Sequence, residues 1–267
     1  MSRIGNYEVK KFPKSRKMVF DLVEQSAKKH HVKAVFEVDV TTAREFFRKH
    51  KEKTGEKLSF TGWVIRCIGG AAKEYPEINS IRKGRRKYYV FEDIDIGIVV
   101  ERNIGGKRVP TKYFMRKVNK KSFREIHDEI RRVQSQKLEG PVLGEVKEDK
   151  TAHLVVKLPK FIRNIIWWQV NRNPLMRKKH LGAITVSAIG MFAEQGGWGI
   201  SMSSETTHFM IGGIGKKPGV VDDKIEIREY LSLTVMIDHF VVDGGPFARF
   251  VQQLINLLQS GFGLDEV

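Results

Sequence analysis

The sequence lacks most features of a secreted or membrane-spanning protein. Cys67 is the single cysteine among 267 residues, so no intramolecular disulfide framework can form. Its apolar neighbours in Trp63–Ile68 predict a helix face in the core. The start, Met1–Asn6, has no hydrophobic secretory core, and no uninterrupted apolar run reaches the roughly 18 to 20 residues needed to cross a bilayer. We expect a cytoplasmic protein.

Proline is scarce as well, and linker-like composition is missing. The chain has eight prolines and no Ala/Pro-rich or Gly/Ser-rich stretch, and no internal repeat emerges. A 41% hydrophobic content over 267 residues is enough to bury one substantial core. These observations predict a single domain over residues 1–267.

Motifs for metal and nucleotide chemistry are also missing. The eight histidines are scattered, and His30 and His31 are adjacent instead of standing at a helical ligand spacing. Cys67 has no nearby partner for zinc. The Gly-Gly pairs resemble turns, and none forms a phosphate-cradling loop between a strand and a helix. We therefore expect no metal.

What the chain does have is positive charge. The formal net charge is +17 and the pI is about 9.9, which would attract polyanions. The densest basic run, Arg82–Tyr89, has Gly84 at its centre between extended segments, which predicts a hairpin tip. Because basic tips are usually solvated surface, we do not expect nucleic acid as a partner.

The apolar spacing predicts alternating helices and strands. Helices are expected at 16–29, 42–53, 58–74, 120–137, 160–172 and 246–259. Strands are expected at 33–40, 87–101, 153–158, 183–188, 206–214 and 225–238.

One strand end is the best candidate for a catalytic base. The β-branched and aliphatic run Leu231–Ile237 predicts a buried strand, and Gly244-Gly245-Pro246 predicts a turn before the next helix. His239 would then lie at the strand end, in reach of a cleft, where a histidine can change protonation near neutral pH. Asp243 follows at a spacing of four. By itself this pattern favours a satisfied core histidine beside a turn-capping aspartate over a catalytic base.

Several further motifs, in the same order along the chain, resemble the catalytic domain of dihydrolipoyl acyltransferases, the core components of 2-oxo acid dehydrogenase complexes, with chloramphenicol acetyltransferase as a more distant relative. The matching segments are Ser15–Met18, His31, Phe36–Val40, Tyr75–Asn79, Ile94–Val100, Val109-Pro110, Ser122–Ile130, Ile184–Phe192 and Asp238–Gly244.

The resemblance implies a fold and a mechanism. The fold would be α/β, a central mixed sheet flanked by helices in the two-layer arrangement of chloramphenicol acetyltransferase. His239 matches the histidine that takes the proton from an incoming thiol, either coenzyme A or dihydrolipoamide. Ser187 matches the residue whose hydroxyl stabilises the oxyanion of the tetrahedral intermediate.

The resemblance also implies supporting residues. Asp243 matches an aspartate that pairs with an arginine near the start of the catalytic domain, here Arg16, and so holds the histidine loop. The alternative for Arg16 is an ordinary solvated cation at a helix start. Asp238 matches the motif residue before the histidine, and its role is left open.

Partners follow from the same resemblance. Acyl-CoA would be a substrate, with the positive charge favouring its phosphates, and the serine and histidine would meet across a subunit boundary in a homotrimer that can enter larger assemblies. The lipoyl and subunit-binding modules of the usual relatives are not recognised, so acyl groups would arrive on a separate lipoyl-bearing protein. Asp149-Lys150 is the nearest match to a lipoylation site, and we interpret it as a solvated loop.

Three departures from the family pattern stand out. Phe240 replaces the arginine after the motif histidine, and Ala188 replaces the asparagine after the motif serine. An unusual basic, aromatic insertion covers about 145–180, and its residues 160–178 predict an amphipathic helix that ends near Pro174. Such a helix usually packs on its own core, and contact with a membrane surface, a partner or the active-site channel are the alternatives.

Two other functions remain open from the sequence. The acyl group could pass to a non-lipoyl acceptor, as in the antibiotic acetyltransferases. The chain could also be a non-catalytic scaffold, although the presence of His239, Ser187 and Asp243 together argues against this.

Overall fold

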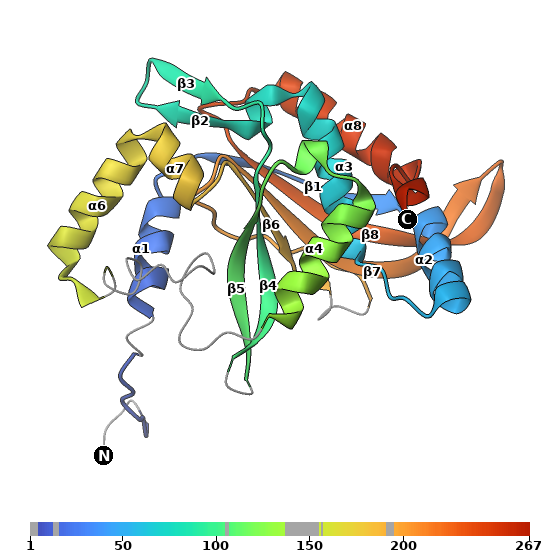
Figure 1. Cartoon of the computed structure of the whole chain (residues 1–267), viewed down its shortest axis with the longest axis horizontal. Helices are drawn as coiled ribbons and strands as arrows, with labels where there is room; N and C mark the ends of the chain where they lie inside the picture. The colour runs from blue at the N-terminus through green and yellow to red at the C-terminus, as the bar shows by residue number, and fades with distance from the viewer. Residues whose placement is uncertain (1–4, 13–15, 105–106, 137–154, 156, 191–194) are drawn as a thin grey trace.

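A mixed sheet with helices packed on one face forms the centre of the protein (Figure 1). The computed structural model describes the chain except residues 1–4, 13–15, 105–106, 137–154, 156 and 191–194, and it describes only the backbone of 101–104 and 107–110.

The sheet has the strand order β1-β8-β7-β6-β4-β5. Strand β6 is parallel to both neighbours, β4 and β7, and the other pairs are antiparallel. The predicted mixed sheet is therefore confirmed. Its strands are β1 (His31–Asp39), β4 (Ile96–Ile104), β5 (Lys107–Met115), β6 (Ile184–Ala188), β7 (Thr207–Val221) and β8 (Lys224–Asp238).

Capping and burial explain the main helices. Ser59 accepts a hydrogen bond from the Gly62 N–H at the start of α3, and Ser122 with Glu125 forms a reciprocal capping box at the start of α4. The α-helices are α1 (Arg16–Ser26), α2 (Thr41–Thr54), α3 (Phe60–Glu74), α4 (Phe123–Ser135), α6 (Lys160–Arg172), α7 (Pro174–His180) and α8 (Gly244–Gln259). Short 3₁₀ helices span Pro76–Asn79, Val118–Lys120 and Leu264–Glu266.

The core lies between the sheet and helices α3, α4 and α8 (Figure 1). Trp63, Phe123 and Phe250, one from each helix, are fully buried, and the Phe250 ring stacks edge-on against Phe209 of β7 at 5.9 Å between centroids. Cys67 is buried on α3, as its apolar neighbours predicted, and burial raises the pKa of its thiol. This cysteine is a core residue.

The basic hairpin is also confirmed. Strands β2 (Ser80–Lys83) and β3 (Lys87–Val90) form a separate two-stranded sheet. Gly84 begins the connecting turn with φ +64°, a left-handed conformation that favours glycine.

The sequence predictions were wrong at several elements. The strand expected at 87–101 is two strands, because the side chain of Asn79 donates to the carbonyls of Phe91 and Asp93 and draws that stretch out of the sheets. The strand expected at 153–158 is helical at Val155 and Lys157 and bends at Leu158, which are its described residues. Edge strand β5 was missed, since Pro110 interrupts the pattern and is tolerated only at a sheet edge. Helix α7 was also missed.

Candidate active site

Alternation along the strands gives the sheet two chemically different faces. On β8, the odd-numbered residues from Leu231 to Ile237 enter the core, and the even-numbered residues from Ser232 to Asp238 are buried on the opposite side. We call this opposite side the polar face. The ionisable and hydroxyl groups on or against it include Lys29, His31, Lys112, Arg177, Ser187, Glu205, His208 and Asp238.

His239 follows β8 directly, at the edge of the polar face. Its loop is held by the backbone, because the His239 N–H donates to the carbonyl of His30 and the Val241 N–H donates to that of Asp238. The ring Nδ1 lies 3.0 Å from the Val242 carbonyl oxygen. Since a carbonyl oxygen can only accept, Nδ1 carries a proton, and in the neutral ring the lone pair is on Nε2. The exposed ring is thus set up to accept a proton through Nε2.

Asp238 is fully buried and anchors the same loop. It pairs with Lys29 at 2.7 Å and accepts a hydrogen bond from the Phe240 N–H. Burial alone would raise the pKa of Asp238, but the attraction and hydrogen bond of Lys29, with a further contribution from Arg82, lower it below its ordinary value. Asp238 is therefore a charged structural anchor under the histidine loop.

We expect Lys29→Met to lower the free energy of unfolding by about 2–3 kcal/mol at neutral pH, because it leaves the Asp238 carboxylate buried without its nearest partner. Denaturant unfolding measures this, with exposed Lys28→Met as a control that should stay within about 0.5 kcal/mol of the wild type. Since the folded-state pKa of Asp238 is lowered, the pair stabilises the fold above the ordinary carboxyl pKa near 4, and its contribution is lost as the pH falls. A Lys29→Met deficit equal to that of the control would contradict the anchoring role.

Phe240, which departs from the family motif, has cationic and aromatic neighbours. The Arg82 guanidinium lies over its ring at 4.5 Å, and the His30 ring meets it edge-on at 4.5 Å. Arg82 reaches this place from hairpin strand β2 and contributes to lowering the pKa of Asp238. A positive charge therefore lies beside position 240 although the motif arginine is missing there.

Ser187 lies on β6, partly buried, with its Oγ 3.1 Å from Nε2 of His208 on β7. Strand register places it level with Met210 of β7 and Thr234 of β8. Asp238 lies four residues further along β8, so at ~3.4 Å per residue and ~4.8 Å between strands it is roughly 16 Å from Ser187. One chain thus does not bring Ser187 and His239 into contact.

The structure does not pair Arg16 with Asp243 within one chain. Arg16 is exposed at the start of α1 and lies 6.0 Å from the Phe20 ring. Asp243 is exposed at the N-cap of α8, where its carbonyl accepts the first helical bond from Phe247 and its side chain makes no capping bond. The ion pair implied by the family resemblance stays a prediction.

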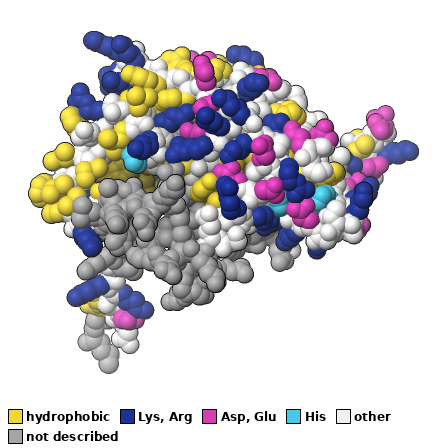
Figure 2. All heavy atoms as spheres, viewed as in Figure 1, with side chains coloured by type: hydrophobic (Ala, Val, Ile, Leu, Met, Phe, Trp, Pro, Cys, Tyr) yellow, Lys and Arg dark blue, Asp and Glu magenta, His cyan; other side chains and the backbone are white. Residues whose placement is uncertain are grey.

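Helix α6 packs against α1 by polar contacts. Arg163 makes a buried ion pair with Asp21 at 2.7 Å, and Trp167 is largely buried beside it. Phe161, Ile165 and Trp168 remain exposed, with exposed fractions of 65%, 58% and 57%. Packing on its own core, the favoured expectation for residues 160–178, therefore holds for one side of the helix only. Figure 2 shows hydrophobic side chains gathered at this end of the molecule.

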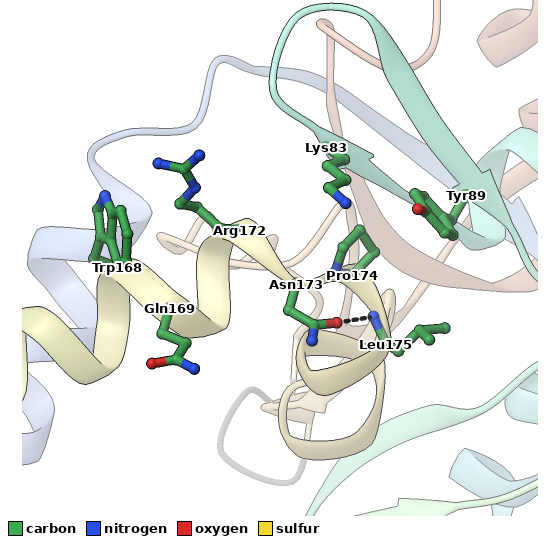
Figure 3. A pocket seen from close by; sticks show the side chains of 8 residues that line it. All are labelled: Lys83, Tyr89, Trp168, Gln169, Arg172, Asn173, Pro174 and Leu175. Carbon is green, nitrogen blue, oxygen red and sulfur yellow. Dashed lines mark hydrogen bonds between the residues drawn. The ribbon is translucent and has the colours of Figure 1, made fainter.

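A pocket of about 480 Å³ lies between the basic hairpin and the junction of α6 and α7 (Figure 3). Its wall includes two cations, Lys83 and Arg172, and two aromatic rings, Tyr89 and Trp168. Arg172 stacks on Trp168 at 4.6 Å, and neither Lys83 nor Arg172 has an ion pair among the described residues. The pocket is suited to an anion with a planar group.

A carboxylate and histidine cluster elsewhere is already paired. Glu56, His127 and Asp128 lie close enough to surround an ion, but Arg124 binds both oxygens of Glu56. His127 accepts the Ser59 N–H at Nδ1, so its Nε2 is the protonated nitrogen and faces Glu56 at 3.3 Å. This arrangement is an ion-pair network.

Two other sequence predictions concern membranes and lipoylation. Among the described residues, no helix combines the length and apolarity that crossing a membrane requires. Asp149-Lys150, the nearest match to a lipoylation site, lies outside the described residues, as do Ser15 and Phe192 of the family motifs.

The sheet and helices match solved acyltransferase cores. A probable dihydrolipoamide acetyltransferase of Listeria monocytogenes superposes with a TM-score of 0.68 at 21% identity, covering 96% of both chains. The dihydrolipoamide acetyltransferase of Azotobacter vinelandii gives 0.68 at 20% identity, covering 98% of this chain and 96% of that one. Chloramphenicol acetyltransferase gives 0.52 at 14% identity, covering 88% and 94%. The predicted fold class is confirmed.

Sequence comparison identifies the family. Its profile, described as 2-oxoacid dehydrogenases acyltransferase (catalytic domain), matches residues 5–148 and 175–262, and the chain belongs to this family. The matched residues leave out 149–174, which includes α6.

Curated relatives show the same similarity. The succinyltransferase component of the 2-oxoglutarate dehydrogenase complex of Staphylococcus saprophyticus is 25% identical over 234 residues, which is 84% of this chain and 46% of the relative. Its Staphylococcus aureus counterpart is 25% identical over 241 residues, with the same two coverages. The chain thus spans about half the length of the curated relatives that it matches.

The sequence did not indicate three residues of this region: Lys29, Arg82 and His208. Lys29 and Arg82 reach Asp238 from a loop and a hairpin far away in sequence. His208 meets Ser187 because β6 and β7 are adjacent and parallel. From the sequence, strand alternation could have shown that His208 and Met210 share one face of their strand. It could not have shown that Ser187 lies beside His208, because that depends on which strands are neighbours.

Proposed function

We propose that the protein is a coenzyme A-dependent acyltransferase that moves an acyl group between CoA and a thiol such as dihydrolipoamide. The observation that carries this proposal is the His239 ring, whose Nδ1–H is engaged by the Val242 carbonyl and whose Nε2 is left as a base. The Azotobacter structure was determined to study a serine, a histidine and an asparagine four residues after that histidine in catalysis. In this chain Asp243 follows His239 by the same four residues, with aspartate in place of asparagine. Ser187 is the candidate for the serine.

In this mechanism His239 Nε2 removes the proton of the acceptor thiol. The sulfur then attacks the thioester carbonyl of acyl-CoA, and the Ser187 hydroxyl donates to the oxyanion of the tetrahedral intermediate. The intermediate collapses by breaking the bond between the acyl carbon and the CoA sulfur. The departing thiolate takes the proton back from His239, so CoA and the new thioester are released with atoms and charge balanced.

The site would be completed between subunits. Ser187 and His239 lie too far apart to share one substrate carbonyl within a chain, so we propose a homotrimer in which they face each other across a subunit boundary. Among solved structures, the cubic core of the pyruvate dehydrogenase multienzyme complex has the same fold, with a TM-score of 0.67 at 18% identity. A larger assembly of trimers is compatible with this proposal.

Residues 1–267 would then act as one catalytic domain, with the 145–180 insertion as an addition to it. A separate lipoyl-bearing protein would bring the acceptor. We propose that Asp238 and Asp243 support the loop that carries His239. Asp238 is itself held by its ion pair with Lys29.

A donor and acceptor panel tests the function. Release of free CoA thiol should be measured with acetyl-, succinyl- and branched-chain acyl-CoA, each with dihydrolipoamide and with a non-thiol acceptor such as chloramphenicol. Turnover with dihydrolipoamide supports the proposal and identifies the acyl group. Turnover with chloramphenicol alone would indicate an acyltransferase that acts on a non-lipoyl acceptor. Binding of acyl-CoA without turnover would indicate a non-catalytic scaffold.

We expect the pocket beside the hairpin to contribute to donor binding, because CoA carries phosphates and an adenine ring. The double variant Lys83→Gln, Arg172→Gln should raise KM for acyl-CoA roughly fivefold and leave kcat unchanged, since exposed charge pairs contribute little each. Steady-state kinetics at low and high salt measure this, and the effect should shrink as salt screens the charges. The control is Arg85→Gln, Arg86→Gln at the exposed hairpin tip. An equal rise of KM in the control would show that the loss of net positive charge, and not of the pocket cations, causes the effect.

A further inference from the structure

His208 is the histidine nearest to the proposed oxyanion serine, and it is 6% exposed. Its Nε2 lies 3.1 Å from Ser187 Oγ, and its Nδ1 faces Ser201 Oγ at 3.5 Å. Strand register fixes this contact, because Thr185 pairs with His208 and Ser187 with Met210, which places serine and histidine side by side on the polar face.

The ring is neutral at physiological pH. Burial is the largest cause that lowers the pKa of His208 to about 4, and the positive charge of Lys112 and the neighbouring His31 act in the same direction, against an opposing effect of Glu205. The ring therefore holds a single proton, and that proton is on either Nε2 or Nδ1.

The two tautomers have opposite consequences for Ser187. A hydroxyl has one proton to donate and two lone pairs that can accept. If Nε2 accepts, the serine proton is directed at the ring and is not available to an oxyanion. If Nε2–H donates to Ser187 Oγ, the serine proton is free to point into the site. Nδ1 can then accept from the Ser201 hydroxyl.

We propose that His208 is a positioning residue that donates from Nε2 to Ser187 Oγ and so directs the Ser187 proton toward the oxyanion. This inference rests on the proposed function. The donors then run in one direction, from Ser201 to His208, from His208 to Ser187 and from Ser187 to the oxyanion, and hydrogen bonds aligned in this way polarise and strengthen one another. No covalent bond is formed or broken at His208.

A double-mutant cycle separates positioning from a merely structural role. His208→Leu should lower kcat about tenfold with little change in KM, as expected for one orienting hydrogen bond. In a Ser187→Ala background the same substitution should cost nothing further, because its effect passes through the serine. His208→Gln, whose side-chain amide can donate to Ser187, should recover most of the activity. His127→Gln, a buried histidine elsewhere, is the matched control and should leave kcat unchanged.

The tautomer is measured without relying on activity. In the 267-residue chain labelled with ¹⁵N-histidine, NMR should show His208 protonated at Nε2, with the signal assigned by its loss in His208→Gln. An Nδ1-protonated His208 would overturn the proposal even if the enzyme is active. Equal losses of kcat for His208→Leu in both backgrounds would also overturn it, as would an acyl-Ser187 adduct trapped and seen by mass spectrometry, since that requires Nε2 to accept. If the proposed acyltransferase function is wrong, the wild-type protein shows no turnover with any acyl-CoA. That result is distinct from the outcomes that would overturn the role of His208.

Discussion

Replacing His239 by alanine should lower kcat for transfer from acyl-CoA to dihydrolipoamide roughly 10²–10⁴-fold. A thiol with a pKa near 8.5 is only slightly ionised at neutral pH, so the attack depends on a base that is already in place. The Val242 carbonyl holds the Nδ1–H of His239, so in the neutral ring the lone pair of a base is on Nε2. The initial rate of CoA thiol release at saturating acyl-CoA measures this change in kcat.

The control for this prediction is His180→Ala, which removes an exposed histidine at the end of α7. It should leave kcat unchanged. If His239→Ala retains most of the wild-type kcat while its melting temperature and oligomeric state are unaltered, the general-base assignment is wrong. Partial recovery of His239→Ala activity as the pH rises toward the thiol pKa would support the assignment, because the acceptor then ionises without help.

Mixed trimers of Ser187→Ala and His239→Ala chains should regain activity that neither variant has alone. Ser187→Ala by itself should lose roughly 10²–10³-fold in kcat with its oxyanion donor. The two residues lie far apart within one chain, so each site would take Ser187 from one subunit and His239 from the next. In a ring of three with both variants present, one boundary in three combines the two intact residues, so about a third of the wild-type kcat per trimer is expected.

Co-expression with two different affinity tags, followed by purification on both, selects the mixed trimers. Trimers that carry both tags but only one variant are the control, and they should stay at the activity of that variant. If mixed trimers are no more active than the single variants, the serine and histidine do not meet across a boundary. A purified monomer with full acyltransferase activity would contradict the proposal of a trimer.

The sequence predicted the positions that depend on local pattern. The run Leu231–Ile237 forms its buried strand and His239 follows it, because β-branched residues, alternation and a Gly-Gly-Pro turn act over a few residues. The helices predicted at 58–74 and 120–137 form as α3 and α4 for the same reason. The order of several weak motifs also identified the family, although no single motif would have done so.

Errors arose where a local signal competed with distant partners. Residues Phe91–Asp95 look like part of a strand, but Asn79 and Asn119 hydrogen-bond to their backbone and hold them outside the sheet. For α6, the apolar spacing predicted a stripe against the core, yet its buried residues are Trp167 and the charged Arg163, which pairs with Asp21. A hydrophobic pattern shows which side of a helix is apolar and not what that side meets.

The sequence by itself determined the family, the fold class and the position of His239 at a strand end. Tertiary structure alone decided which groups surround these positions: Lys29 and Arg82 near Asp238, and His208 beside Ser187. The physical reason is that periodicity and turns are set by neighbours in the chain, whereas strand order and register are set by packing of the whole sheet. Charges and protonation states in the polar face depend on that packing, so they could not be inferred from the sequence.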